Sequence, residues 1–206
     1  MNNEYKKIIN HYNNSFKKHG FNLKALNWRS LKDNNARFKT ATEHINSHDK
    51  SILDFGCGTS LFFNFLKKKK IKIEYNGLDT NREVVEYCKK KFPKNKYYCF
   101  DIMNESKKYK NLKNDVVFAN GIFTQKLTIS NNNMYLFTFS LIKKLFKFSK
   151  KKIIFNILID DVEWKNPKNF YVSINKILKF IKNEISDKIV LRLDYNKFEC
   201  MIVVYK

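Results

Sequence analysis

The sequence lacks the features of a membrane-spanning or secreted chain. It has no run of about 18 apolar residues, so we expect no spanning helix. The first twenty residues show neither the continuous apolar segment nor the small-residue cleavage site of a secretory signal. The four cysteines, at positions 57, 88, 99 and 200, form no C-x-x-C pair, which disfavours a zinc site and a disulfide framework. We therefore expect a reduced, cytoplasmic protein without a bound metal.

The chain is also poor in arginine and in acidic residues. It has 41 lysines and arginines against 19 aspartates and glutamates, which gives a formal net charge of +22 at pH 7. The arginines are only Arg29, Arg37, Arg82 and Arg192. Because arginine reads phosphates and guanine edges bidentately, we interpret the lysine excess as a solvated surface rather than an RNA footprint. A nucleic-acid partner stays open, and the positive field favours an anionic small-molecule substrate.

Glycine is scarce as well, which makes its positions informative. Two of the five glycines, Gly56 and Gly58, fall in the stretch SILDFGCGTS at residues 51–60. Glycine tends to occur where the backbone needs a positive φ or where a ligand must approach it closely. A turn that leads from a strand into a helix is where nucleotide-like ligands bind in an open α/β sheet.

The rest of the chain alternates between strand and helix patterns. At 206 residues it is most simply one domain, with a polar, helical cover over residues 1–48 that belongs to the same domain as residues 49–206. We predict strands at 51–55, 71–79, 96–101, 114–121, 151–159, 188–195 and 198–206. We predict helices at 60–69, 81–92, 134–150 and 170–185. The alternation indicates a parallel sheet with helices on both faces. The short last connection permits only an antiparallel hairpin.

Three aspartates, Asp54, Asp79 and Asp101, lie at or near the ends of three successive strands. The carboxyl ends of parallel strands meet at one edge of a sheet, so these side chains should lie along that edge. Asp79 follows Asp54 at about the interval at which a nucleotide-binding fold places its ribose-binding acid. The glycine turn has no third glycine and no G-K-[ST], which indicates a nucleoside-like ligand without a pyrophosphate.

These motifs resemble those of the class I S-adenosylmethionine-dependent methyltransferases over essentially the whole chain. LDFGCGTS is similar to their first motif, YNGLD to the strand that ends in the ribose-binding acid, YCFDI to the adenine-contacting turn and DVVFANGIF to the fourth-strand motif. The resemblance implies a Rossmann-like seven-stranded sheet, with six parallel strands and an antiparallel seventh. It also implies S-adenosylmethionine as cofactor and S-adenosylhomocysteine as product.

The resemblance assigns cofactor contacts residue by residue. Gly56 and Gly58 would let the backbone approach the methionine part, and Asp54 would orient their turn. Asp79 would hold the ribose hydroxyls, and Asp101 the adenine amine. The remaining cofactor-binding candidates adjoin these motifs: Arg37 for the methionine carboxylate or an anionic substrate group, Cys57 in the turn, Thr80, Ile102 on the adenine ring, Asn120 for the methionine ammonium, and Gly121.

A narrower resemblance concerns the ends of the chain. HGFNLKALNW, the ARF at 36–38, GIF at 121–123 and VLRLDYNKFECMIVVYK are similar to a group of small bacterial methyltransferases often found among genes for surface polysaccharides. His19 and Asp160 are the candidate general bases, although His19 could be structural and Asp160 could belong to a solvated loop. Trp28 and Tyr171 are the candidate substrate-binding residues, with packing as the alternative for Trp28.

We therefore expect a methyltransferase that acts on a small polar acceptor. O-methylation of a sugar or phosphate-bearing metabolite fits best, because the N-P-P-[YF] signal of amino methylation does not follow the fourth strand. An RNA methyltransferase and a cofactor-binding protein without catalysis are the alternatives. The sequence leaves the oligomeric state open.

Overall fold

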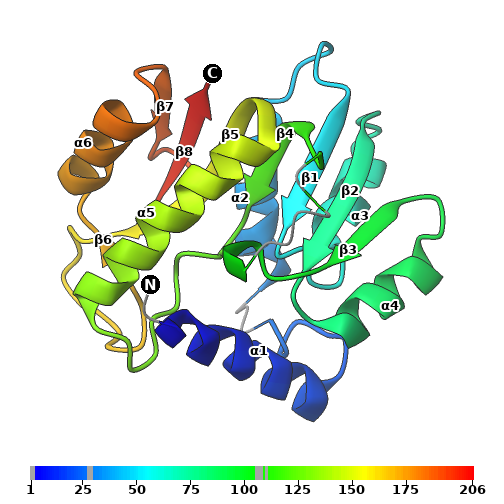
Figure 1. Ribbon diagram of the computed structural model, residues 1–206, viewed down its shortest axis with the longest axis horizontal. Helices are drawn as coiled ribbons and strands as arrows, with labels where there is room; N and C mark the ends of the chain where they lie inside the picture. The colour runs from blue at the N-terminus through cyan, green and yellow to red at the C-terminus, as the bar shows by residue number, and fades with distance from the viewer. Residues whose placement is uncertain (1–2, 27–29, 105–108, 110) are drawn as a thin grey trace.

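The computed structural model describes residues 3–26, 30–104, 109 and 111–206. Its strands and helices follow the predicted alternation (Figure 1). The strands are β1 (Ser51–Phe55), β2 (Glu74–Asp79), β3 (Lys96–Cys99), β4 (Asn114–Ala119), β5 (Ser149–Ile159), β6 (Tyr171–Val172), β7 (Ile189–Arg192) and β8 (Glu199–Tyr205). The α-helices are α1 (Lys6–His19), α2 (Leu31–Thr42), α3 (Leu61–Lys68), α4 (Arg82–Lys91), α5 (Asn131–Phe148) and α6 (Ile174–Glu184), and the short 3-10 turns are η1 (Asn3–Tyr5) and η2 (Ile102–Asn104).

The strands form one mixed sheet in the order β3-β2-β1-β4-β5-β8-β7. β1 to β5 are mutually parallel, and β8 runs antiparallel to both β5 and β7. The predicted Rossmann-like fold with one antiparallel strand is therefore confirmed. The two-residue strand β6, which pairs with the end of β5, was not predicted.

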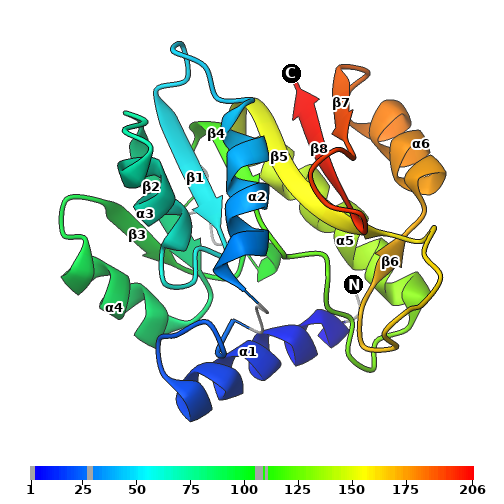
Figure 2. The same cartoon turned by 180° about the vertical axis from the view of Figure 1, so that it is seen from behind.

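The helices cover the sheet on both faces and divide its apolar side chains into two cores. α5 and α6 lie on the face seen in Figure 1, and α2 and α3 lie on the face seen in Figure 2. Because strand side chains alternate between faces, Leu53 of β1 joins the core beneath α5 while Ile52 joins the core beneath α2 and α3. Each face of the sheet is thus sealed, as expected for parallel strands.

Polar residues at the helix starts explain where several of the helices begin. Ser30, Asn81, Ser130 and Ser173 precede α2, α4, α5 and α6, and each side chain accepts a hydrogen bond from a backbone N–H in the first turn. Such caps satisfy donors that the helix itself leaves unpaired. In the part of the chain that the structure describes, no helix is both long and apolar enough to cross a membrane.

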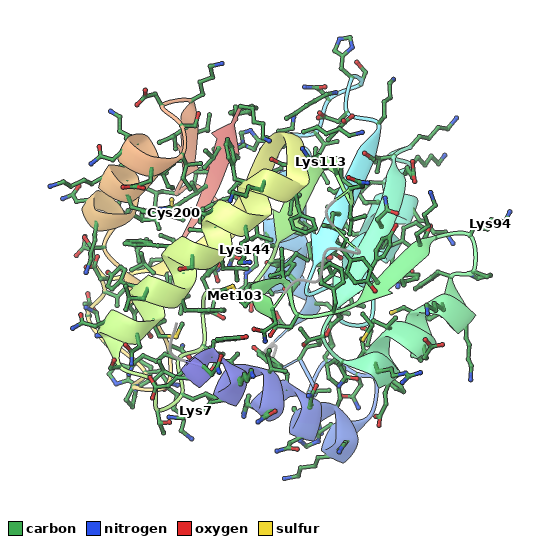
Figure 3. The ribbon with its side chains drawn as sticks, viewed as in Figure 1. Lys7, Lys94, Met103, Lys113, Lys144 and Cys200 are labelled. Carbon is green, nitrogen blue, oxygen red and sulfur yellow. The ribbon has the colours of Figure 1, made fainter. Side chains whose placement is uncertain are left out.

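Exposed lysine side chains occur on many parts of the fold, although Lys152 is buried and pairs with Asp49. Figure 3 labels Lys7 on α1, Lys94 before β3, Lys113 before β4 and Lys144 on α5, which lie on separate parts of the molecule. The positive charge is thus carried by several elements and is not confined to one of them.

Candidate functional site

A pocket lies at the edge of the sheet where β1, β2 and β4 end, and α1 lies across that edge (Figure 1). The space within it, including the part open to solvent, is about 950 Å³. We call it the main pocket. Its wall comes from α1, the ends of β1 to β4 and α5: Tyr5, Ile8, Ile9, Tyr12, Asn13, Phe16, Leu26, Phe55, Gly56, Gly58, Leu78, Asp79, Thr80, Asn81, Asp101, Ile102, Met103, Asn120, Gly121, Ile122, Phe137 and Leu141.

The glycine turn after β1 forms one wall of the main pocket. Gly56 and Gly58 have φ of +70° and +50°, a region that side-chain-bearing residues rarely adopt. A Cβ on Gly56 would lie 2.3 Å from Cδ1 of Ile122, and one on Gly58 would lie 2.9 Å from Cδ2 of Leu26. Glycine therefore suits both positions, because the backbone is left-handed and the side chains of Ile122 and Leu26 pack where a Cβ would lie.

Asp79, at the end of β2, holds this turn through hydrogen bonds. Its Oδ2 accepts from the N–H of Gly58 at 3.0 Å, and its Oδ1 accepts from the N–H of Asn81 at 3.0 Å. Burial raises the pKa of the Asp79 carboxyl, although these N–H groups act to lower it. A carboxylate oxygen can accept more than one hydrogen bond, so Asp79 keeps acceptor capacity for hydroxyl groups of a ligand.

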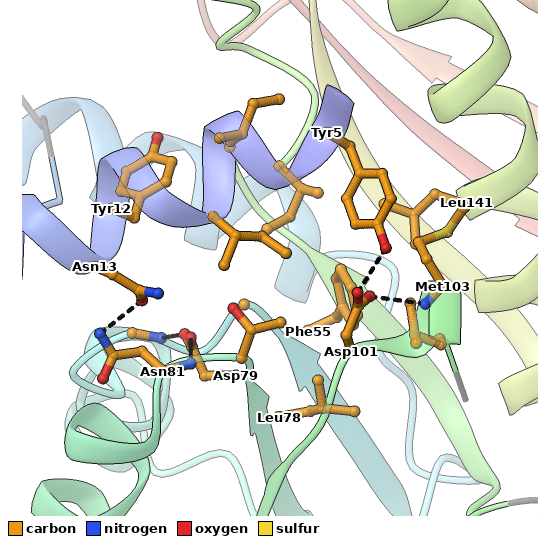
Figure 4. Close-up of a pocket in the computed structure, with 18 of the residues that line it drawn as sticks. Tyr5, Tyr12, Asn13, Phe55, Leu78, Asp79, Asn81, Asp101, Met103 and Leu141 are labelled. Carbon is orange, nitrogen blue, oxygen red and sulfur yellow. Dashed lines mark hydrogen bonds between the residues drawn. The ribbon is translucent and has the colours of Figure 1, made fainter. Parts of the chain in front are cut away.

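Asp101, which follows β3, is linked to the N-terminal segment. Its Oδ2 accepts from the Tyr5 hydroxyl at 2.7 Å, and its Oδ1 accepts from the Met103 N–H at 2.9 Å (Figure 4). The same Oδ2 also accepts from Asn104 Nδ2 at 3.0 Å. Burial raises the pKa of Tyr5, and the Asp101 hydrogen bond raises it further. The Tyr5 hydroxyl thus already donates a hydrogen bond to Oδ2 of Asp101.

A smaller recess adjoins the main pocket behind the glycine turn. Its wall consists of Leu26, Phe38, Asp54, Gly56, Cys57, Gly58, Leu61, Phe62 and Asn120. Asp54 is 4% exposed, and its Oδ2 accepts from the Tyr75 hydroxyl at 2.6 Å. Burial, opposed by the Tyr75 hydrogen bond and reinforced by the charge of Asp79, raises the pKa of Asp54 to about 7.

The cover over the main pocket is the apolar face of α1. Tyr5, just before this helix, and Tyr12 on it both line the main pocket, and Figure 4 shows the Tyr5 hydroxyl directed at Asp101. Asn13 fastens the helix from the other side, because its Oδ1 accepts from Asn81 Nδ2 at 2.9 Å. The helix therefore shields the site from solvent and contacts the elements that bear the two carboxylates.

The structure brings most of the predicted cofactor residues together. Gly56, Gly58, Asp79, Thr80, Asp101, Ile102, Asn120 and Gly121 line the main pocket, and Asp54 and Cys57 line the recess. Cys57 is buried at 6% exposure, consistent with a packing role in the turn. Their predicted contacts with a cofactor remain predictions.

Other predicted site residues lie elsewhere. His19 is at the carboxyl end of α1, Asp160 is exposed after β5, and Tyr171 in β6 accepts a hydrogen bond from the Asn166 N–H; none of these lines either cavity. Arg37 also lies outside both walls, because its guanidinium binds Glu199 and Asn34. Trp28 lies outside the described residues.

Sequence reasoning predicted a helical cover over residues 1–48, but not which residues of α1 line the pocket or fasten the helix. Tyr5, Ile8, Tyr12 and Phe16 recur at helical spacing, which indicates an apolar face but not the groups that it contacts. The periodicity was visible in the sequence, whereas the Tyr5–Asp101 contact joins residues 96 positions apart. No local pattern predicts such a pair.

The residues present fit a nucleoside cofactor that ends in an amino acid. The two carboxylates can accept from hydroxyl and amine groups, and the glycine turn lies in the wall of the same pocket. Asn120 adds a buried side-chain oxygen, Oδ1, that has no hydrogen-bond partner within the described structure. Buried acceptors are normally paired, so this oxygen is suited to a ligand donor.

Sheet order and site together define an α/β protein with a pocket at the carboxyl edge of its sheet that suits a nucleoside-like ligand. Comparison with protein families then identifies the family to which the chain belongs. The chain belongs to the family described as "Methyltransferase domain", whose profile matches residues 46–171, more than half of the chain. The expected membership in the methyltransferases is thereby confirmed.

Curated relatives are similar over much of this chain. The ribosomal RNA small subunit methyltransferase A of Mesomycoplasma hyopneumoniae strain J is 29% identical over 169 residues, which are 82% of this chain and 51% of that protein. The same enzyme from strain 232 is 28% identical over an equal length. The chain thus spans about half the length of the curated relatives it matches.

Solved structures share the fold at low sequence identity. The magnesium protoporphyrin IX methyltransferase of Synechocystis PCC 6803 with bound S-adenosylhomocysteine has a TM-score of 0.59 at 10% identity, covering 98% of this chain and 97% of that one. The plantazolicin methyltransferase BpumL in complex with S-adenosylhomocysteine has a TM-score of 0.59 at 15% identity, covering 100% and 91%. The cofactor expected from the sequence agrees with those complexes.

Proposed function

We propose that this protein transfers a methyl group from S-adenosylmethionine to a small acceptor within the main pocket. The observation that carries the proposal is the juxtaposition of the glycine turn, the carboxylates of Asp79 and Asp101, and the unpaired Asn120 oxygen in one covered pocket. When bound, the cofactor supplies a methyl group on a positively charged sulfur. The residues of the chain orient the reactants and exclude water, and such positioning can supply roughly 7–11 kcal/mol.

For the acceptor we propose O-methylation of a small polar metabolite, in line with the resemblance to enzymes of surface polysaccharide clusters. Among the described residues that line the main pocket, none is lysine or arginine. This favours an uncharged sugar hydroxyl over a phosphate group, despite the net charge of the surface. Tyr12, whose pKa burial raises to about 12 against the opposing charge of Arg37, stays a neutral hydroxyl at physiological pH.

The direct test measures cofactor binding and turnover separately. Calorimetry with S-adenosylhomocysteine should show saturable binding that Asp79→Ala weakens strongly. Methyl transfer from labelled S-adenosylmethionine should then appear with neutral sugars rather than with sugar phosphates. Absence of any heat with the cofactor product would refute the assignment. Binding without transfer to any acceptor would instead favour a cofactor-binding protein without catalysis.

RNA methylation is the second candidate, because the curated relatives are ribosomal RNA methyltransferases and the net charge is +22. Binding to RNA through lysines releases counterions, so its affinity should fall steeply with salt. A tight complex with ribosomal RNA at physiological salt, together with methyl transfer to it, would replace the small-molecule proposal.

A further inference from the structure

One buried carboxylate holds the turn after β4 from two sides. Glu199, the first residue of β8, is 3% exposed. Its Oε2 accepts from Arg37 Nε at 2.8 Å, from Asn156 Nδ2 at 3.1 Å and from the Tyr195 hydroxyl at 3.2 Å. Its Oε1 accepts from Arg37 Nη2. Four donor contacts from three parts of the chain therefore converge on this carboxylate.

Two series of hydrogen bonds, which we call arms, run from the Arg37–Glu199 pair to Asn120 and Gly121, two consecutive residues of the site. In the first arm, Arg37 Nη1 donates to Asn34 Oδ1 at 3.2 Å, and Asn120 Nδ2 donates to the same oxygen at 3.4 Å. In the second arm, Asn156 Oδ1 accepts from the Gly121 N–H at 2.7 Å. The side chain of Asn120 and the backbone of Gly121 are thus fixed together.

The chemistry of the ion pair dictates which way the amides face. A guanidinium carries only donors, so it requires Asn34 to turn its oxygen toward Arg37. That oxygen can accept only from a donor, so Asn120 must turn its Nδ2 toward Asn34. The Oδ1 of Asn120 is then left on the other side, buried and without a partner among the described residues. A carboxylate accepts only, so Asn156 likewise turns its nitrogen to Glu199 and its oxygen to Gly121.

The surroundings of Asn120 indicate which ligand group this oxygen receives. Asn120 lines both the main pocket and the recess, which meet at Gly56 and Gly58, whereas Asp79 and Asp101 line only the main pocket. A ligand with its nucleoside part at those carboxylates places its far end at the glycine turn. The described wall of the recess has the Asp54 carboxyl and the Asn120 carbonyl but no basic side chain. It therefore suits a cation.

We propose that the Arg37–Glu199 pair is a positioning device that sets the hydrogen-bond polarity of the turn after β4, so that Asn120 presents its side-chain oxygen to the ammonium group of the bound cofactor. This inference rests on the proposed function. It gives Arg37 a different role from the one that the sequence suggests, which is contact with the methionine carboxylate or with an anionic group of the substrate. Asn34, Asn156 and Glu199 act only through Asn120 and Gly121, so they are positioning residues.

The test compares two ligands that differ only in the amino-acid part. S-adenosylhomocysteine carries the ammonium, whereas 5′-methylthioadenosine carries the nucleoside and the thioether without it. Asn34→Ala should weaken the former about tenfold, the effect of losing one hydrogen bond to a charged group, and leave the latter unchanged. Asn34→Asp keeps an oxygen for both Arg37 and Asn120, so it should restore most of the affinity for S-adenosylhomocysteine.

A matched control separates positioning from general loss of stability. Asn114→Ala breaks a buried amide pair, Asn76 to Asn114 at 2.8 Å, at the opposite end of β4 from the site. It should lower the melting temperature without changing the affinity for either ligand. If Asn34→Ala does not fold, Asn120→Ser, which withdraws the same oxygen, takes its place with the same expectation.

The outcomes distinguish the inference from the proposed function. Selective weakening of S-adenosylhomocysteine with rescue by Asn34→Asp supports the positioning device. Equal weakening of both ligands, or no weakening of either, overturns it and leaves the proposed function standing. Failure of both ligands to bind the unsubstituted protein overturns the proposed function, and the inference falls with it.

Discussion

Replacing Asp54 with asparagine isolates the energetic cost of a carboxyl group buried beside the glycine turn. Asp54 is 4% exposed, and burial is the main cause that raises its pKa to about 7. In the unfolded chain the same group loses its proton near pH 4. Between these values the native state binds more protons than the unfolded state, so the free energy of unfolding falls as pH rises. Below and above that window, Asp54 does not make the free energy of unfolding depend on pH.

The size of the effect follows from the two pKa values. A difference of about three pKa units corresponds to an upper bound of about 4 kcal/mol at 1.36 kcal/mol per unit. Between pH 5 and pH 8, where the fold is easiest to study, about 2–3 kcal/mol of this should be visible. An asparagine has nearly the same shape, does not ionise, and offers an oxygen to the Tyr75 hydroxyl, which lies 2.6 Å from the aspartate.

Urea unfolding of the ligand-free protein, followed by circular dichroism at several pH values, measures this difference. Asp54→Asn should gain stability over the unsubstituted protein as pH rises from 5 to 8. Asp115→Asn is the control of opposite sign. Burial acts to raise the pKa of Asp115, but the Lys50 N–H and Lys151 lower it overall, so that variant should lose stability relative to the unsubstituted protein as pH rises from acid. The reasoning is refuted if the difference in free energy of unfolding between Asp54→Asn and the unsubstituted protein does not change between pH 5 and pH 8.

Three further predictions concern the cover, the turn and the core. Tyr5→Phe frees the Asp101 oxygen that accepts from the tyrosine at 2.7 Å. Calorimetry should show that S-adenosylhomocysteine binds a few-fold more tightly, about the net worth of one hydrogen bond. Weaker binding would mean that the hydroxyl contacts the ligand. Gly56→Ala places a Cβ 2.3 Å from Cδ1 of Ile122 at φ +70° and should lower the free energy of unfolding by about 1–2 kcal/mol from backbone strain alone. Adding Ile122→Ala should recover the steric part only; full recovery would contradict the backbone argument. Phe38→Ala removes a ring that is 2% exposed against three phenylalanines and should cost about 3–5 kcal/mol in urea unfolding; a loss below 1 kcal/mol would show that α2 packs less tightly than described.

The order of the fold was predictable because each element carries its own pattern. Short apolar strands alternate with amphipathic helices, and the brief connection before residue 199 allows only a hairpin. The connection from β5 to β7, which contains β6 and α6, was harder to predict. The predicted helix at 170–185 begins at Ile174, because Ser173 caps it, and this frees Tyr171 and Val172 to pair with β5. A two-residue strand carries no periodicity that a sequence could reveal.

The site was predictable only where its residues lie at strand ends. Gly56, Asp79 and Asp101 belong to such ends, and the parallel topology brings them together. Arg37 and Glu199 are 162 positions apart, and the chain offers no local sign that one partners the other. A lone arginine near a binding motif fits an anionic ligand as well as a buried carboxylate, and only the tertiary structure distinguishes the two.

The position of β8 bears on how the protein is made. β8 is the last strand along the chain, yet it lies between β5 and β7 in the sheet. Until β8 pairs with it, one edge of the eleven-residue β5 stays open, and unpaired edges are templates for pairing with other chains. The strand that closes this edge also delivers Glu199. Pairing of β8 therefore closes the open edge of β5 and completes the hydrogen bonds around Asn120 and Gly121 in one step of folding.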